Sequence, residues 1–203
     1  MAMKRELMVK LLGRLRVRYE RAMQPIGKRL GKMGATPNTI TTFSLILAVL
    51  AALAYASKAP LLGALGLVSS GMVDMLDGAV ARATGKTTKF GAVYDPVLDR
   101  YAEFAIIVGI AVGGFTEWVW AIFALFGMVM ASYTRARAES SGGLTSCTVG
   151  IAERQEKIIL LLVGSLLQPF LTTALSVCVI VVGVLSHVTV VQRLYFTFKN
   201  TPR

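Results

Sequence analysis

Long apolar stretches, separated by short polar segments, make up most of the chain. Six of them approach or exceed the roughly 20 residues that a helix needs to cross a bilayer. They lie at about residues 38–57, 60–81, 90–114, 118–136, 156–176 and 177–195. Only Gln168-Pro169 and a few small residues punctuate the last two, so a break near 168–171 fits equally well. The pattern predicts an all-α integral membrane protein with six transmembrane helices.

The segment before these stretches has a different period. Between residues 4 and 30 apolar side chains recur at helical spacing, and most of the cations lie between them. The apolar residues are Leu7, Leu11, Leu12, Leu15, Tyr19 and Met23. This pattern predicts an amphipathic helix in the membrane interface, with its cations on anionic headgroups. Thr36-Pro37-Asn38 then marks a turn in which Thr or Asn can cap the first span. We therefore expect one membrane domain over residues 1–203, with an amphipathic cytoplasmic segment (1–35) and a six-helix bundle (36–203).

Charge placement predicts the orientation in the membrane. The chain of 203 residues is 55% hydrophobic with mean hydropathy +0.63, yet its formal net charge is +11. Ten of its Lys and Arg residues precede residue 38, and most of the others flank every second connection, whereas the alternate connections hold only Lys58 and Glu117. The positive-inside rule predicts that both termini and both long loops lie in the cytoplasm, so that a site at the ends of the spans beside these loops faces the cytoplasm. No RNA-binding motif or mixture of aromatic and basic residues is present, so a nucleic-acid partner is not expected.

Four aspartates interrupt the apolar pattern. Asp74 and Asp77 precede the second connection, and Asp95 and Asp99 follow it. Spacings of three and four residues place each pair on one helix face, about 8–15 Å below the turn. Carboxylates at such depth need a compensating partner. Facing pairs would form an oxygen cage for two divalent cations, Mg²⁺ or Mn²⁺, in an arrangement suited to phosphoryl transfer.

Two further residues indicate a phosphate ligand. Gly78 removes a side chain where a bulky substrate approaches the backbone, and Arg82 can offer bidentate hydrogen bonds to a phosphate. Together with the aspartates they indicate a site for a nucleotide diphosphate. A carboxylate-based ion transporter is an alternative from another class. It accounts for acidic residues in spans but not for Gly78, Arg82 or the shallow, matched depths.

The run D-x2-D-G-x2-A-R-x8-G-x3-D-x3-D over residues 74–99 resembles the signature of the CDP-alcohol phosphotransferase family at all eight fixed positions. The resemblance implies that an alcohol hydroxyl attacks a CDP-linked lipid, giving a phosphodiester and CMP. It implies that Asp74, Asp77 and Asp95 hold the metals, with Asp99 near the second ion and acting as the general base. The positions implied for CDP-lipid binding are Thr36, Pro37, Asn38, Thr39, Gly78, Arg82 and Thr88.

The acceptor is indicated by arginines outside this motif. Arg135, Arg154 and Arg193 lie at the expected cytoplasmic ends of three spans, and each alone would also suit a cation facing headgroups. Three arginines together beside an acidic metal site favour a phosphorylated alcohol as the acceptor. The surrounding patterns S-Y-x-x-A-R-A-E, E-R-x-E and V-Q-R resemble the phosphatidylinositol-phosphate synthases of actinobacteria and their archaeal counterparts, which implies inositol 1-phosphate. Arg135 and Gln155 depart from the bacterial pattern, which has Lys and Pro there. Glycerol 3-phosphate, another anionic acceptor, is the alternative.

Small residues recur within the spans, including Gly63, Gly66 and Gly109. In lipid such residues allow close approach of helices. We therefore expect tight helix packing and a homodimer surrounded by membrane lipid.

Overall fold

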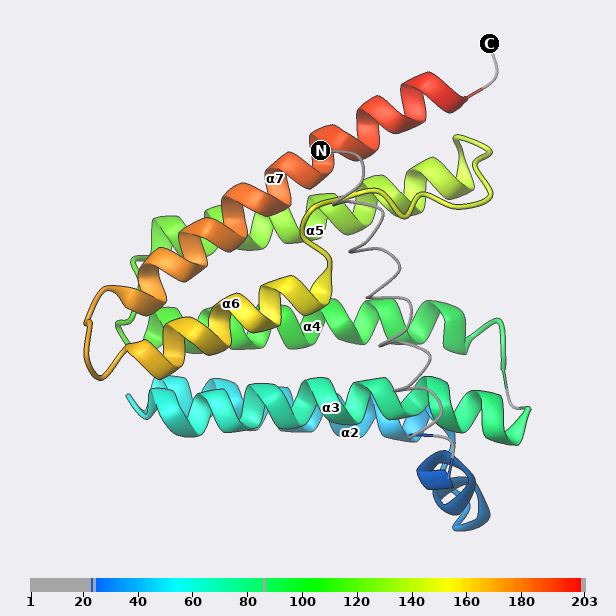
Figure 1. Ribbon diagram of the computed structural model, residues 1–203, viewed down its shortest axis with the longest axis horizontal. Coiled ribbons are helices and arrows are strands. Elements are labelled where there is room, and N and C mark those ends of the chain that lie inside the picture. The colour runs from blue at the N-terminus through cyan, green and yellow to red at the C-terminus, as the bar shows by residue number, and fades with distance from the viewer. Residues whose placement is uncertain (1–22, 24, 86, 202–203) are drawn as a thin grey trace, which may run out of the picture. The chain divides into compact units, whose positions relative to one another are not determined.

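The computed structural model describes residues 23, 25–85 and 87–201, and all regular structure within them is helical (Figure 1). The helices are α2 (Pro37–Ala56), α3 (Pro60–Thr84), α4 (Gly91–Val112), α5 (Trp118–Ser140), α6 (Arg154–Leu167) and α7 (Ala174–Asn200). Residues 25–32 are also helical. The all-α prediction is confirmed, whereas the expected amphipathic helix before residue 23 lies outside the described residues.

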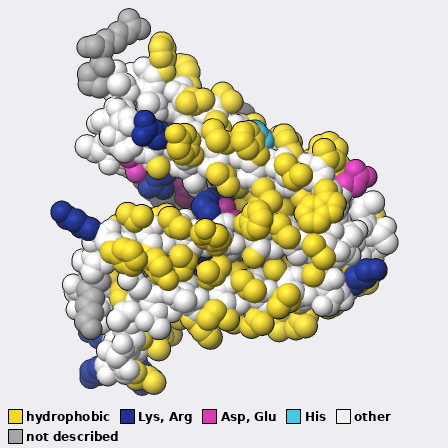
Figure 2. Space-filling view, turned by 180° about the vertical axis from the view of Figure 1, so that it is seen from behind, with side chains coloured by type: hydrophobic (Ala, Val, Ile, Leu, Met, Phe, Trp, Pro, Cys, Tyr) yellow, Lys and Arg dark blue, Asp and Glu magenta, His cyan; other side chains and the backbone are white. Residues whose placement is uncertain are grey.

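Four of these helices are long and apolar enough to cross a membrane: α2, α3, α5 and α7, with hydropathies of 2.0, 1.3, 1.4 and 2.5. Helix α4 carries Asp95, Asp99, Arg100 and Glu103, and α6 has only 14 residues. Many large apolar side chains are exposed, and Figure 2 shows hydrophobic side chains over most of the face that it draws. Since water would disfavour such a surface, the protein is an integral membrane protein.

The connection between α6 and α7 settles the open helix boundary. Residues 168–173 are not helical, so a division at 176/177 is wrong and the alternative break near 168–171 is right. Gln168 stabilises the turn, because its Nε2 donates to the Thr172 carbonyl at 2.7 Å and its Oε1 accepts from the Leu175 amide at 2.9 Å. The side-chain amide thus satisfies backbone groups that the helix ends leave open. Helix α5 also runs beyond the expected residue 136, to Ser140.

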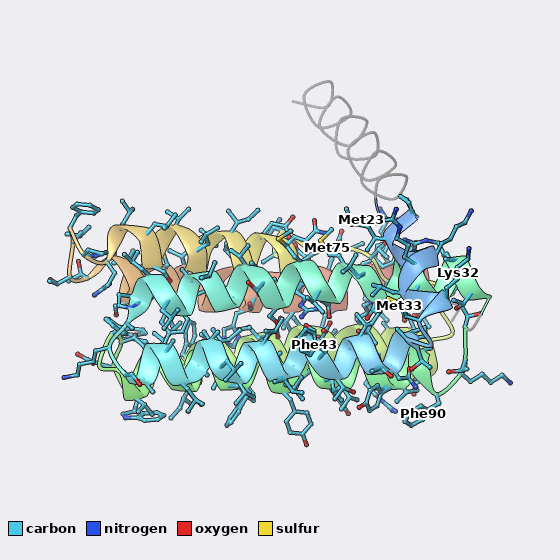
Figure 3. The ribbon with its side chains drawn as sticks, turned by 90° about the horizontal axis from the view of Figure 1, so that it is seen from below. Met23, Lys32, Met33, Phe43, Met75 and Phe90 are labelled. Carbon is cyan, nitrogen blue, oxygen red and sulfur yellow. The ribbon has the colours of Figure 1, made fainter. Side chains whose placement is uncertain are left out.

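The chain divides into two compact units. The first comprises Met1–Leu45 and Ser70–Asp99 and contains both aspartate pairs. Its N-terminal helical residues lie against α3, where a Cβ on Gly27 would come within 2.8 Å of the Ala79 backbone (Figure 3). Thr36 caps α2, because its Oγ1 accepts the Thr39 amide at 3.2 Å, as the sequence predicts.

The second unit comprises Ile46–Ser69 and Arg100–Arg203. Within it α7 packs against α5 and α6. Buried Tyr55 on α2 forms a hydrogen bond of 2.7 Å to Ser165 on α6. Gly109 on α4 approaches the backbone of Ala52 so closely that a Cβ would clash with it. The small residues do provide close helix contact, as expected in lipid.

Candidate functional site

Three of the four aspartates form a cluster of potential metal ligands. Asp74 on α3 and Asp95 and Asp99 on α4 each offer a carboxylate oxygen, and these atoms lie within 4.8 Å of one another. All three residues are half-buried. The i,i+4 spacing places the two α4 carboxylates on one face, and the turn after α3 brings Asp74 to them.

Asp77 lies beside this cluster. Its carboxylate is close enough to Asp74 to interact electrostatically and is within hydrogen-bonding reach of Asp95. Its Oδ2 accepts a hydrogen bond of 2.9 Å from Thr41 Oγ1 on α2. Four carboxylates in so small a space need a compensating positive charge. Their hard oxygen atoms suit Mg²⁺ or Mn²⁺, so the residues present fit a divalent metal centre.

A cavity of about 220 Å³ adjoins the carboxylates. It is lined by Pro37, Asn38, Thr41, Asp77, Gly78, Ala81, Thr87, Thr88, Gly91, Ala92 and Asp95. Four of the residues expected to bind the CDP-lipid are therefore gathered here: Pro37, Asn38, Gly78 and Thr88. Two of the expected metal ligands, Asp77 and Asp95, line the same cavity. A CDP-linked ligand needs such an arrangement, because its nucleotide and its metal-bound diphosphate must lie side by side.

Local backbone chemistry shapes one wall of this cavity. Thr88 Oγ1 accepts the amide of Gly91 at 2.9 Å and so caps the start of α4. A Cβ on Gly91 would lie 3.1 Å from Thr88 Oγ1 and 3.2 Å from Asn38 Oδ1. Glycine at this position therefore lets the start of α4 approach α2 closely. The sequence motif contains Gly91, but its spacing alone did not indicate this contact.

The other residues expected to contact the nucleotide, Arg82, Thr36 and Thr39, lie outside the lining of this cavity. Arg82 folds back along α3, so that a Cβ on Gly78 would lie 3.3 Å from its Nη1. The hydroxyls of Thr36 and Thr39 form a hydrogen bond of 2.8 Å at the start of α2. These three residues do not line the cavity in the part of the chain that the structure describes. Their contact with a nucleotide stays a prediction.

Two of the expected acceptor arginines lie close together in the second unit. Arg193 and Arg135 are near enough to interact electrostatically with each other, and both also interact electrostatically with Glu139. Arg193 is buried, with its Nε donating to the Val149 carbonyl at 2.8 Å and its Nη1 to the Ala131 carbonyl at 2.6 Å. Exposed Arg135 forms an ion pair of 3.1 Å with Glu139. Arg154 interacts electrostatically with Lys157.

Sequence reasoning missed a buried charge cluster beside these arginines. Lys157 Nζ lies 2.8 Å from Oε1 of Glu103, whose Oε2 lies 2.9 Å from Arg100 Nη1. Arg100 Nη1 also donates to Ser132 Oγ at 2.6 Å. The cluster joins α4, α5 and α6. The charged residues Arg100 and Glu103, which follow the two aspartates of α4, were the signal that could have revealed it.

Comparison with known proteins decides the family. The model for CDP-alcohol phosphatidyltransferase matches residues 34–198. The chain belongs to this family. Archaetidylinositol phosphate synthase of Pyrococcus horikoshii is 37% identical over 185 residues, covering 91% of this chain and 95% of the relative. The synthase of the same name from Methanothermobacter thermautotrophicus is 40% identical over 194 residues, covering 94% and 95%.

The chain is also similar to solved structures of a phosphatidylinositol phosphate synthase. Phosphatidylinositol phosphate synthase of Mycobacterium tuberculosis with CDP-DAG bound is 32% identical, with a TM-score of 0.79 over 90% of this chain and 96% of that one. The same enzyme in complex with manganese and citrate has a TM-score of 0.78 at 32% identity, over 89% and 90%. The predicted family is confirmed, and the chain is an enzyme of the CDP-alcohol phosphotransferase class.

Proposed function

We propose that the protein transfers the phosphatidyl-type group of a CDP-linked lipid to a hydroxyl of inositol 1-phosphate and releases CMP. The observation that carries this proposal is the cavity in which Asp77 and Asp95 lie together with Pro37, Asn38 and Gly78. This cavity of about 220 Å³ adjoins a cluster of hard oxygen ligands. The names of the relatives and of the solved neighbours support the inositol-phosphate product.

The reaction needs a base for the acceptor hydroxyl, and we assign this role to Asp99. The hydroxyl oxygen forms a bond to the lipid-linked phosphorus, and the bond from that phosphorus to the oxygen bridging to CMP breaks. The hydroxyl proton passes to the Asp99 carboxylate, and CMP departs with the bridging oxygen. Positioned carboxylates typically contribute such proton transfer when they lie within hydrogen-bonding reach of the reacting group.

We assign the metal centre to Asp74, Asp77, Asp95 and Asp99, with two divalent cations, Mg²⁺ or Mn²⁺. When bound, these cations would neutralise the charge that develops on the diphosphate and on departing CMP. The compact carboxylate cluster supports this assignment. A solved relative in complex with manganese supports it too.

Binding of the donor and the acceptor falls to two further sets of residues. We assign CDP-lipid binding to Gly78, Arg82 and Thr88, with the segment Thr36-Pro37-Asn38-Thr39 closing over the nucleotide. We assign the acceptor phosphate to Arg135, Arg154 and Arg193. The proximity of Arg135 and Arg193 supports an anionic ligand. Glycerol 3-phosphate also carries a phosphate, so it is the competing acceptor to be tested.

We further propose that all six helices, α2 to α7, cross the membrane as a single domain, with both termini and the active site in the cytoplasm and two copies forming a dimer. The 22 residues of α4 reach about 33 Å at 1.5 Å per residue, which matches a bilayer core. Cysteine labelling from each side of sealed vesicles at position 58 and at position 145 checks the orientation. Labelling of both positions from the same side contradicts it.

An acceptor panel tests the function directly. Purified protein receives CDP-diacylglycerol or its ether-linked counterpart, together with inositol 1-phosphate, inositol or glycerol 3-phosphate. CMP release and the mass of the lipid product are measured with Mg²⁺, with Mn²⁺ and after chelation. We expect an inositol-phosphate lipid only with inositol 1-phosphate and only with a divalent cation.

The matched control for the site is a pair of carboxylate substitutions. Asp95→Asn should abolish CMP release, whereas Glu117→Gln, at the exposed N-cap of α5 without a side-chain capping bond, should not. Product from glycerol 3-phosphate alone would make that acceptor the correct one. CMP release that survives thorough chelation would contradict the metal assignment. Absence of CMP release with every acceptor would contradict the proposed function as a whole.

A further inference from the structure

Helix α2 contacts both of the helices that carry the aspartates, through two adjacent threonines. Thr41 Oγ1 donates to Asp77 Oδ2 on α3 at 2.9 Å. Thr42 Oγ1 lies 2.9 Å from the hydroxyl of Tyr94 on α4, the residue before Asp95. Consecutive residues on a helix point about 100° apart, so neighbouring positions reach different partners. These contacts give α2 a role beyond lining the cavity.

The hydroxyl of Thr41 has two acceptors within reach. It lies 3.1 Å from the Pro37 carbonyl, one turn earlier, and 2.9 Å from the Asp77 carboxylate. A hydroxyl carries only one proton, so the two acceptors compete for it. A carboxylate forms the stronger bond because it is charged. Thr41 is 3% exposed, so water has little access to replace this bond.

We propose that Thr41 is a positioning residue that holds the Asp77 carboxylate in the orientation needed for metal binding. Helix α2 is then part of the metal centre. This inference rests on the proposed function, because it takes Asp77 to be a metal ligand.

Electrostatics explains why Asp77 needs such a partner. Asp74 lies close enough to repel the Asp77 carboxylate, and this repulsion favours rotation of the carboxylate away from Asp74. A hydrogen bond to one oxygen opposes that rotation before the cation arrives. Loss of hydrogen-bond partners that hold metal ligands typically lowers metal affinity or activity by about 10- to 100-fold.

Ser44 provides a matched control on the same helix. It is 2% exposed, and like Thr41 it joins α2 to α3 through its hydroxyl. Its partners, however, are the carbonyl and the hydroxyl of Ser70, at 3.0 and 3.1 Å. Ser44→Ala therefore removes a buried bond between the same two helices without touching a carboxylate.

The experiment measures Mn²⁺ binding without any lipid substrate. The parent protein, Thr41→Val, Thr41→Ser and Ser44→Ala are purified in detergent, and free Mn²⁺ is followed by electron paramagnetic resonance during titration. We expect Thr41→Val to bind Mn²⁺ about tenfold more weakly, and Thr41→Ser and Ser44→Ala to match the parent. Thermal unfolding of each apo protein reports whether the fold is kept. Raising the Mn²⁺ concentration should restore much of the CMP release of Thr41→Val.

Each other outcome has a defined meaning. Parent-like Mn²⁺ binding by Thr41→Val overturns the inference, and so does equal weakness of Thr41→Ser. If Thr41→Val does not fold, Mn²⁺ binding is compared between Thr41→Ala and Thr41→Ser instead. Equal Mn²⁺ affinity of these two variants overturns the inference. Loss of CMP release that extra Mn²⁺ does not relieve means that Thr41 serves only as a cavity wall. If Asp77→Asn binds Mn²⁺ like the parent, the proposed metal centre itself is wrong.

Discussion

Glu103 holds two cations, with Lys157 Nζ 2.8 Å from one carboxylate oxygen and Arg100 Nη1 2.9 Å from the other. The side chains of Lys157 and Glu103 are 7% and 11% exposed, so water screens them little. A buried ion pair is not by itself a source of stability, but its disruption leaves an uncompensated charge. Glu103 therefore ties the start of α6 to the middle of α4.

Glu103→Gln should destabilise the protein strongly, because it keeps the shape of the side chain but leaves two cations without a carboxylate. Breaking one partner of a buried pair typically costs about 3–5 kcal/mol. Thermal unfolding in detergent should show a clear fall in Tm. Glu153→Gln, at the exposed N-cap of α6, is the control and should leave Tm unchanged. An unchanged Tm for Glu103→Gln contradicts the structural role of the pair.

Arg193→Ala should raise the KM for the phosphorylated acceptor and also lower Tm. The second effect follows because its guanidinium bonds the carbonyls of Val149 and Ala131. Arg135→Ala should raise the same KM with little change in Tm, since exposed ion pairs contribute about 0–1 kcal/mol. Steady-state kinetics and thermal unfolding on both variants test this. If neither variant changes the acceptor KM, these arginines do not bind the acceptor phosphate.

Asp99→Asn should reduce kcat by about 100-fold or more, the range typical for loss of a positioned general base. Its effect on CDP-lipid affinity should be much smaller, because the other three aspartates remain. Because Asp99 lies in the cluster with Asp74 and Asp95, some loss of metal affinity should accompany the change. Single-turnover CMP release at saturating Mn²⁺, compared with CDP-lipid binding, separates these effects. Equal losses in turnover and in binding argue against a separate base.

Gly78→Ala should weaken CDP-lipid binding while the fold survives. The new Cβ would lie in the cavity wall, and its nearest neighbour would be the flexible end of Arg82, at 3.3 Å. Gly109→Ala should lower Tm and leave the KM for CDP-lipid unchanged. Its Cβ would clash with the Ala52 backbone, which cannot move aside as a side chain can. The KM for CDP-lipid and the Tm of each variant are the measurements. A lower Tm for Gly78→Ala with an unchanged KM contradicts the assignment of Gly78 to the site.

The sequence was sufficient to predict that the aspartates lie close together. Asp95 and Asp99 share a face because helical spacing alone places them so, and the turn after α3 brings Asp74 to them. The cap of α2 by Thr36 is a local feature as well. Local preferences of this kind act within a few residues of the chain, which is why they can be read from it. The pattern predicts six membrane spans, whereas four of the described helices are long and apolar enough to cross a membrane, because the charges of α4 and the shortness of α6 weaken the apolar signal.

The sequence by itself determined the all-α membrane class and the two aspartate pairs, because periodicity and spacing encode helices and their faces. The family followed from the resemblance of the motif over residues 74–99. Only the tertiary structure decided that Thr41 bonds Asp77, that Glu103 joins Lys157 to Arg100, and that Arg193 bonds two backbone carbonyls. Apart from Arg100, which lies one helical turn before Glu103, these partners lie between 36 and 62 residues apart in the chain. Which distant polar groups meet depends on helix packing, and an apolar helix surface in lipid carries little pattern to reveal it.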